Sequence, residues 1–236
     1  MSKGYSESEL KDKRSFKRVL ELAVNPIKGN FDLEHLKKIN AYIFQDSPDV
    51  AGKFRPEVTQ GVHWHKERSY KGWDRTLVSY SRMTRDDIQE LDKTLKSIDL
   101  NKLSNLNKED FAKEITNLYK KLDHIHPFPD GNSRTLREFT RTLSEQCGYK
   151  LDWSKSSQNE VYLGRDFEVN NLVISKSKDP VLIERLQDEN SAIRSHSEYK
   201  SLEKTISSAL SALDKNINKT YQIQFSYNKE SSSQYI

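Results

Sequence analysis

Apolar and polar positions alternate along the chain with spacings that predict several amphipathic helices. The first stripe has apolar side chains three or four residues apart, as on one helical face: Leu33, Leu36, Ile39 and Ile43. Asp32 precedes this stripe and can cap its first turn. The pattern predicts a helix over residues 33–45 that ends before Pro48.

The most regular stripe lies in the middle of the chain. It comprises Phe111, Ile115, Leu118, Leu122 and Ile125. Asn107 can cap its start, and the acidic Glu109 and Asp110 favour the positive end of the helix dipole. Because Pro127 disfavours helical geometry at the preceding residue, the helix is expected to stop at His126.

Two further stripes follow. The first comprises Leu136, Phe139, Leu143 and Cys147, and Gly148 can close that helix in a left-handed conformation. The second follows Pro180 and predicts a C-terminal helix: Tyr199, Leu202, Ile206, Leu210, Leu213 and Ile217.

Helical spacing disappears between residues 51 and 83. Glycines and β-favouring residues replace it, and the latter are Val62, Trp64, Leu77, Val78 and Tyr80. This stretch predicts a loop with a β-hairpin, so the expected fold is all-α with one short hairpin. His63 and His65 share a strand face, but without a third ligand nearby they are more typical of hairpin surface than of a metal site.

Composition limits the possible functions of this chain. A net charge of +4, spread evenly, does not predict a nucleic-acid partner. The one cysteine, Cys147, rules out an intramolecular disulfide and is typical of a small buried residue. No window approaches the ~20 apolar residues of a membrane span, and residues 1–5 lack an apolar leader. The expected location is cytoplasmic where the protein is made.

Chemically useful residues crowd one polar loop between the two central helices. The backbone N–H groups of Gly131, Asn132 and Ser133 can converge on a phosphate at a helix N-terminus. Gly131 permits the close approach or positive φ that such a nest requires. Asp130 offers a hard oxygen ligand for Mg²⁺. The loop therefore predicts a polyphosphate site with magnesium.

Three further side chains extend this site. Arg134 and Arg137 share a helix face and can reach outer phosphates. His126, at the end of the preceding helix, is positioned to act as a general base for an incoming hydroxyl. Taken singly, each residue also suits an ordinary polar turn or helix end.

The whole segment resembles the signature of the Fic family. Residues 126–137 read HPFPDGNSRTLR and match eight of the nine specified positions of H-[FP]-F-x-[DE]-G-N-G-R-x-x-R. Residues 51–55, AGKFR, are similar to the A-G-x-x-R that precedes the family's hairpin flap. Residues 147–149, CGY, resemble the A-G-Y after its motif helix. The resemblance covers roughly residues 30–175.

The resemblance implies an all-α core with a short hairpin flap and a role for each matching residue. His126 would deprotonate the target hydroxyl, and Asp130 would hold Mg²⁺. Asn132 would orient phosphate, while Phe128 would anchor the loop. Arg134 and Arg137 would bind outer phosphates, with Arg137 at the γ-phosphate. The flap, within residues 54–80, would take up the target's backbone as an added strand.

The implied activity is transfer of AMP from Mg-ATP to a Tyr, Thr or Ser hydroxyl of a target protein. Ser133 departs from the family's usual glycine. Doc-type relatives carry lysine there and act as kinases, so a Doc-like protein kinase is one alternative. An inactive Fic-fold binding scaffold is another, although a scaffold has no use for a general base.

The family also has a form of self-restraint that this sequence lacks. An inhibitory helix would carry [ST]-x-x-x-E-[GN], but Glu189 has Arg185 at the Ser/Thr position, and Glu160 is followed by Val161. The resemblance therefore implies a separate antitoxin protein, as in the toxin and secreted-effector branches, which leaves secretion into a host cell open. The expected domains are a catalytic unit over 1–178, a helical extension over 179–228 and a disordered tail over 229–236.

Overall fold

The computed structural model describes residues 6–59, 64–70 and 73–213. In these segments the chain forms nine α-helices, a short 3₁₀ turn and two small antiparallel sheets. The elements are α1 (Glu7–Val24), α2 (Leu33–Ile43), β1 (Trp64–Tyr70), β2 (Trp73–Tyr80), α3 (Arg85–Lys96), α4 (Leu100–Ser104), α5 (Lys108–Ile125), α6 (Asn132–Gln146), β3 (Tyr149–Leu151), η1 (Trp153–Lys155), α7 (Gln158–Lys176), α8 (Pro180–Ser195), α9 (Leu202–Ala209) and β4 (Leu210–Ala212). The predicted tail and Val62, His63 and Ile217 lie outside the described residues.

The predicted helix starts are confirmed. The side chain of Asp32 accepts from the His35 N–H at the start of α2, and Asn107 accepts from the Asp110 N–H at the start of α5. Gly148 follows α6 with a φ of 89°, as expected of a left-handed cap. The all-α fold with a short hairpin is therefore what the chain adopts.

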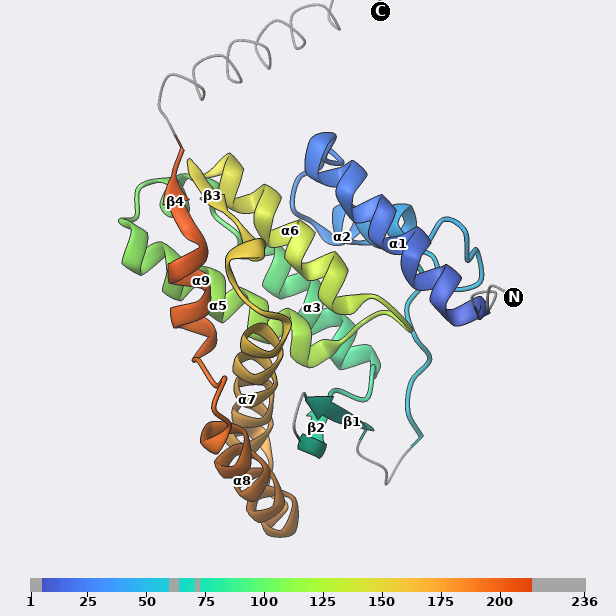
Figure 1. The fold of residues 1–236 in the computed structure, drawn as a ribbon, viewed down its shortest axis with the longest axis vertical. Helices are drawn as coiled ribbons and strands as arrows, with labels where there is room; N and C mark the ends of the chain where they lie inside the picture. The colour runs from blue at the N-terminus through green and yellow to red at the C-terminus, as the bar shows by residue number, and fades with distance from the viewer. Residues whose placement is uncertain (1–5, 60–63, 71–72, 214–236) are drawn as a thin grey trace, which may run out of the picture.

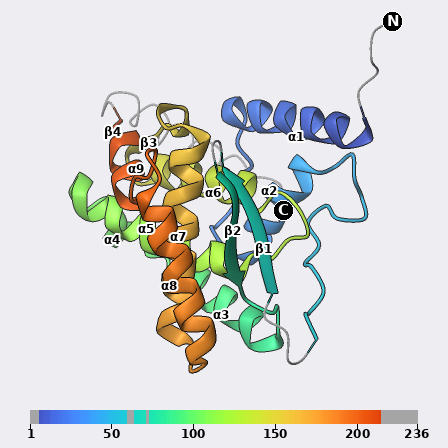
Figure 2. The ribbon, with the colours of Figure 1, turned by 60° about the horizontal axis from the view of Figure 1, so that its bottom comes forward.

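Helices α5 and α6 occupy the centre of the molecule and bury its main core (Figure 1). The core combines side chains from α2, α5, α6 and the loop between the last two, among them Leu36, Ile39, Phe111, Ile115, Leu122, Phe128, Leu136 and Phe139. Helix α1 crosses over α2 and α6 on one side (Figure 2). The core side chains of α2, α5 and α6 thus hold the loop between α5 and α6 in place, and α1 lies beside that loop.

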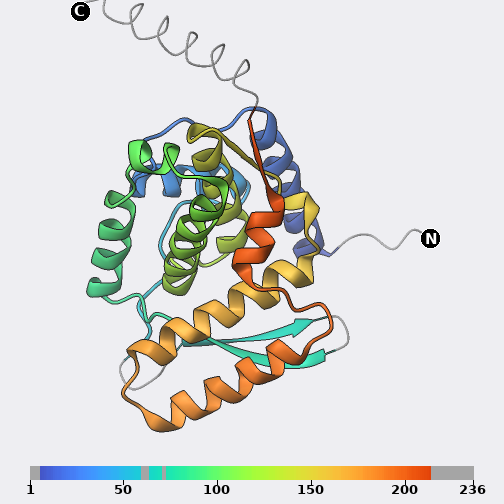
Figure 3. The same cartoon turned by 90° about the vertical axis from the view of Figure 1, so that its left-hand side faces the viewer.

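The hairpin lies against the long α7–α8 pair (Figure 3). Strand β2 packs on both helices, which leaves β1 as the outer strand. Alternate residues of a strand face one way, so Trp64, Lys66 and Arg68 share one face of β1. Trp64 pairs in register with Tyr80 of β2.

The predicted C-terminal helix is wrong beyond Ala209. Leu210–Ala212 forms strand β4, which pairs antiparallel with β3. Leu210 is nevertheless buried in the main core, as its apolar character predicts for a helix or a strand. The division at residue 178 stays a prediction, although Leu202 and Ile206 share that core with α5. None of the helices described is long and apolar enough to span a bilayer.

Candidate active site

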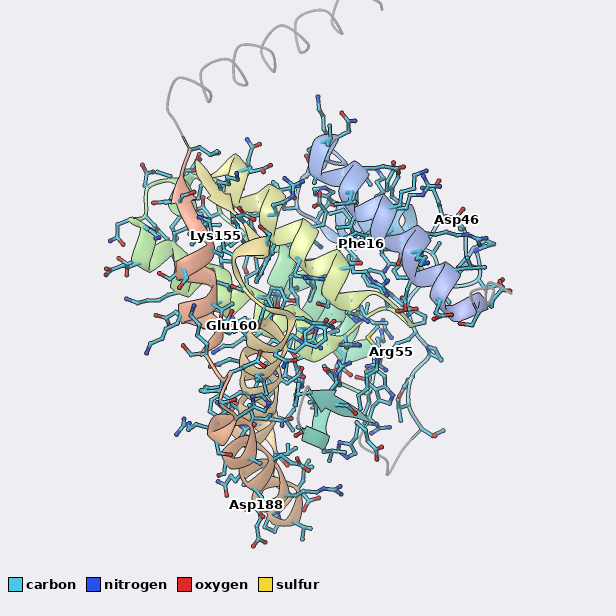
Figure 4. All side chains as sticks on the ribbon, viewed as in Figure 1. Phe16, Asp46, Arg55, Lys155, Glu160 and Asp188 are labelled. Carbon is cyan, nitrogen blue, oxygen red and sulfur yellow. The ribbon has the colours of Figure 1, made fainter. Side chains whose placement is uncertain are left out.

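His126 ends α5 in a strained conformation. Its φ of 49° and ψ of 59° are left-handed, which is uncommon for a residue with a side chain. Buried Arg55 holds this turn: its Nε donates to the His126 carbonyl at 2.8 Å, and Nη2 donates to the Ile125 carbonyl at 3.2 Å. The negative end of the helix dipole also stabilises a cation at the C-terminus of a helix. Arg55 (Figure 4) thus positions the backbone that carries the imidazole.

Aromatic rings from the hairpin enclose the imidazole. The ring centroid of Tyr80 lies 4.2 Å from that of His126, and the ring of Trp64 lies at 5.3 Å. The guanidinium of Arg55 stacks over Trp64 at 3.9 Å. His126 is consequently only 3% exposed, and its environment is formed as much by the flap as by α5.

The two ring nitrogens of His126 face different partners. Nδ1 lies 3.4 Å from a carboxylate oxygen of Asp123, one turn earlier on α5. Nε2 lies 3.1 Å from Nζ of Lys66 on β1. Burial lowers the pKa of His126 to about 3, although Asp123 opposes the shift. The imidazole is therefore neutral at pH 7, as a general base must be.

A buried ionic network lies behind this pair. Arg165 of α7 places Nε 3.4 Å from Asp123 and 3.0 Å from Asp166. Asp166 also accepts from the Tyr70 hydroxyl at 2.8 Å, which ties the hairpin to α7. Arg165, Asp123 and Asp166 are each at most 1% exposed. Arg68 of β1 adds a second cation 3.8 Å from Asp166, so two guanidinium groups balance the two carboxylates where water is excluded.

The loop after His126 is closed by its own side chains. The amide of Asn132 donates to the Phe128 carbonyl at 2.7 Å, and its oxygen accepts from the Phe128 N–H at 2.9 Å. Gly131 adopts a φ of 72°, where an added Cβ would lie 1.9 Å from the ring of Phe44. Only glycine fits there, which agrees with the expectation for Gly131. Asn132 clamps the loop, so its predicted phosphate contact stays a prediction.

Helix α6 begins without a side-chain cap. Every other α-helix that the structure describes has a Ser, Thr, Asp or Asn side chain accepting from its first turn, whereas α6 begins after Gly131. The N–H groups of Asn132, Ser133 and Arg134 belong to that first turn, where intrahelical acceptors are lacking. This terminus is suited to an anion.

Charged side chains of α1 and α6 surround the same terminus. Asp130 is 37% exposed and pairs with Lys11 at 2.9 Å and with Arg134 at 3.2 Å. Its pKa is lowered: burial alone would raise it, but Lys11 and Arg134 outweigh burial. Arg134 also contacts Asp12 and Ser15. The predicted metal ligand and phosphate ligand therefore meet, each with a partner from α1.

Ser133 and Arg137 complete the predicted set. The buried Ser133 hydroxyl lies near that of Tyr119, without a hydrogen bond of ordinary geometry. Arg137 is half-buried one turn further along α6. Among the described residues no carboxylate lies within ion-pair distance of Arg137, and its Nε donates only to the Ser133 carbonyl, at 3.4 Å.

This geometry can be compared with known proteins. The family model described as the Fic/DOC family matches residues 30–144, a range that includes Arg55 and the whole loop from His126 to Arg137. Residues 30–144 belong to the Fic/DOC family. The match to the Fic family ends before α7, so Arg165 and Asp166 belong to a part of the chain that the family model does not cover.

Curated relatives of the Fic segment carry enzymatic names. Protein adenylyltransferase VbhT of Bartonella schoenbuchensis is 31% identical over 144 residues, which cover 61% of this chain and 27% of the relative. A protein adenylyltransferase of Bartonella henselae is 28% identical, covering 58% of this chain and 26% of the relative. The chain thus spans about a quarter of the length of these two relatives.

Solved Fic structures share the fold. The N-terminal Fic domain of a VirB-translocated Bep effector from Bartonella quintana, with bound ADP, has a TM-score of 0.60 at 19% identity, covering 88% of this chain and 86% of that one. BepC from Bartonella tribocorum, with bound AMPPNP, has a TM-score of 0.58 at 21% identity, covering 89% and 91%.

The Fic site also contains residues that sequence reasoning missed. Asn40 is buried and donates to the Asp130 carbonyl at 3.2 Å and to Thr135 at 3.1 Å, so it joins α2 to the loop. Asp123 and Lys66 contact the imidazole directly. The spacing of Asp123 three residues before His126 on one helix was the signal that could have identified it.

Proposed function

We propose that this Fic domain is a protein adenylyltransferase that transfers AMP from Mg-ATP to a Tyr, Thr or Ser hydroxyl of a target protein. The observation that carries the proposal is the pairing of a buried, neutral His126 with an uncapped α6 terminus. The family membership and the adenylyltransferase names of the relatives support it.

The proposed chemistry assigns the base and the anion sites to different elements. Nε2 of His126 accepts the proton of the target hydroxyl, whose oxygen attacks the α-phosphorus while the bond to pyrophosphate breaks. The N–H groups of Asn132, Ser133 and Arg134 would bind phosphate oxygens. Arg134 and Arg137 would bind the outer phosphates, with Arg137 at the γ-phosphate.

Asp130 would hold Mg²⁺ with phosphate oxygens and water. Its partly exposed carboxylate suits this ion, which often binds through one or two carboxylates and keeps several waters. The described residues contain no group of three potential metal ligands, which fits Mg²⁺ better than a fully protein-bound metal. When bound, the ion would neutralise charge on the departing pyrophosphate.

The target would dock along β1, the outer strand of the hairpin. An added strand there would bring a target hydroxyl close to Lys66 of β1 and to His126, whose Nε2 lies 3.1 Å from Nζ of Lys66. In this arrangement, backbone hydrogen bonds to β1 would fix the register of the target strand. The hydroxyl-bearing side chain that reaches Nε2 of His126 would then be the one modified.

A Doc-like kinase is the second candidate because Ser133 replaces the usual glycine. Ser133 adds no charge, which favours AMP transfer over transfer of the γ-phosphate. The test is to incubate the chain with Mg-ATP and a cell lysate, then identify adducts by mass spectrometry. An AMP adduct is expected. A phosphate adduct would support the kinase, and no adduct with bound ATP would support the scaffold.

Regulation would come from a separate antitoxin. Arg137 lacks a carboxylate partner among the described residues. Helix α1, which packs against α6, carries exposed apolar Phe16, Leu20 and Val24, with Phe16 labelled in Figure 4. A partner helix packed on that row could bring a glutamate to Arg137. The test is to scan the chain's own glutamates to glycine. One substitution that strongly raises automodification would reveal an internal inhibitor instead.

A further inference from the structure

The carboxylate of Asp123 is unusual among the charges around the site. It is fully buried, yet among the described residues neither of its oxygens makes a hydrogen bond of ordinary geometry. One oxygen lies 3.4 Å from Nδ1 of His126, and the other lies 3.4 Å from Nε of Arg165. A buried charge left so loosely paired is costly, so its position needs a reason.

The contact on the opposite side of the imidazole identifies the tautomer. Nε2 lies 3.1 Å from Nζ of Lys66, and an ammonium group can only donate. Burial lowers the pKa of Lys66 to about 8, which still leaves it mostly protonated at pH 7. Nε2 must therefore carry the lone pair, and the proton resides on Nδ1, where it faces Asp123.

The carboxylate of Asp123 is in turn held in place by a side chain of α7. Arg165 lies between Asp123 and Asp166, and Asp166 accepts from the hydroxyl of Tyr70. Burial would raise the pKa of Asp123, but Arg165 and His126 hold it below its usual range. The carboxylate is therefore ionised, and moving it away would break its pairing with Arg165 and leave its own charge buried without a cation.

We propose that Asp123 is the positioning residue that holds His126 as its Nδ1–H tautomer, with Nε2 directed at the target hydroxyl, and that Arg165 holds Asp123 in place. The inference rests on the proposed function. As the oxygen–phosphorus bond forms and pyrophosphate departs, the hydroxyl proton passes to Nε2. The resulting imidazolium is balanced by Asp123, and the proton then leaves to water or pyrophosphate.

Lys66 occupies the place that the hydroxyl needs in this scheme. It must withdraw from Nε2 when the target docks, and its position on the flap allows the docked strand to displace it. The 3.4 Å gap between Nδ1 and Asp123 is expected to shorten in the loaded enzyme, because catalytic hydrogen bonds often tighten on binding.

A purely structural role for Asp123, as a counter-charge for Arg165, makes a different prediction. Asp166 is equally buried and lies closer to Arg165, at 3.0 Å, but no contact joins it to His126. Asp123→Asn and Asp166→Asn each remove one buried negative charge beside the same guanidinium. They form a matched pair that separates the two roles.

The first measurement is nitrogen NMR of the imidazole of His126 in the unsubstituted chain at neutral pH. The expected spectrum has a protonated Nδ1 and an unprotonated Nε2. A protonated Nε2 would overturn the proposal. Because this readout needs neither activity nor a variant, a protonated Nε2 would refute the proposal even if Asp123→Asn does not fold, a point that thermal unfolding checks.

The second measurement is steady-state AMP transfer by the folded variants. Asp123→Asn should lower kcat roughly 100-fold and leave the target KM within about threefold, since only the base is affected. Asp166→Asn should lower kcat far less, with its main effect on the target KM through Tyr70. Equal losses of kcat, or a loss below about threefold in Asp123→Asn, would overturn the proposal.

The two measurements also separate this proposal from the proposed function. A chain that transfers no AMP but has the Nδ1–H tautomer would refute the function and leave the role of Asp123 in holding the imidazole intact. A chain that transfers AMP with His126 protonated on Nε2 would keep the function and refute the role of Asp123.

Discussion

The two sides of His126 are built in opposite ways. Behind it, Asp123, Arg165 and Asp166 are fully enclosed and hold one another in place. In the loop and the first turn of α6 that follow it, Asp130 and Arg134 make ion pairs with α1 whose members are partly exposed. Water and salt weaken pairs of the second kind but hardly reach those of the first. The proposed base is thus preset, whereas the groups proposed for metal and phosphate can exchange partners.

The largest expected effect is on the preset side. His126→Ala should lower AMP transfer at least ~1,000-fold, because the imidazole alone accepts the proton, while nucleotide binding stays nearly unchanged. His124→Gln is the matched control, since His124 is also buried but has no contact with the imidazole of His126. Transfer by His126→Ala at a near-normal rate would contradict the assignment.

The exchangeable side should show a smaller loss. Asp130→Ala should reduce Mg²⁺-dependent transfer roughly 100-fold, because the phosphates lose the charge that the carboxylate anchors. Titration calorimetry should find weaker Mg-ATP binding. Unchanged affinity would count against the metal role of Asp130.

The buried side should also make stability depend on pH. The unfolded chain protonates His124 and His126 near the ordinary pKa of 6.5, whereas burial lowers the folded pKa values to about 4 and about 3. The unfolded state therefore binds more protons below 6.5, so stability is full above that pH and falls as pH falls. The free energy of unfolding should drop roughly 3–4 kcal/mol from pH 7.5 to pH 5.

Denaturant unfolding at several pH values measures this slope. His124→Gln should remove about half of it, because one of the two buried imidazoles is gone. An unfolding free energy that does not change between pH 7.5 and 5 would mean that the histidines are hydrated in solution.

A few-fold effect is expected at the contact with α1. Lys11→Gln removes a competitor for the Asp130 carboxylate, so half-maximal transfer should need up to about fivefold less Mg²⁺, the most that a surface ion pair allows. Asp12→Asn, which alters the partner of Arg134 instead, should not shift the Mg²⁺ requirement. An equal shift in both variants would indicate a general loosening of α1.

The smallest effect is expected at Ser133. Ser133→Gly should preserve or raise transfer, since it restores the usual space beside the phosphates. A loss above about tenfold, ~1.4 kcal/mol in the barrier, would mean that the hydroxyl is a working ligand.

Local patterns predicted the parts of this fold that depend on local physics. Asn107 and Asp32 cap their helices, and Gly131 takes a positive φ, because these effects act within one turn. The error at Leu210 arose because its apolar spacing continues that of α9, while pairing with β3, some sixty residues earlier, decides its structure. The hairpin boundaries were equally beyond local reasoning.

Sequence reasoning likewise predicted only part of the candidate site. The loop residues were found because they adjoin one another, but Asn40, Lys66 and Arg165 act across long sequence distances. One sign was present: Arg165 and Asp166 lie between the apolar Leu163 and Phe167 on α7. Charges in such a position require buried partners, yet the sequence does not say which.

The absence of a side-chain cap on α6 has a consequence for the life of the protein. A nucleotide bound at this terminus, as proposed, would bind only the folded chain and would shift the folding equilibrium by about 2.7 kcal/mol at a hundred times its dissociation constant. The co-substrate would then act as a folding ligand. The nucleotide-bound protein would then be degraded by proteases more slowly than the free chain.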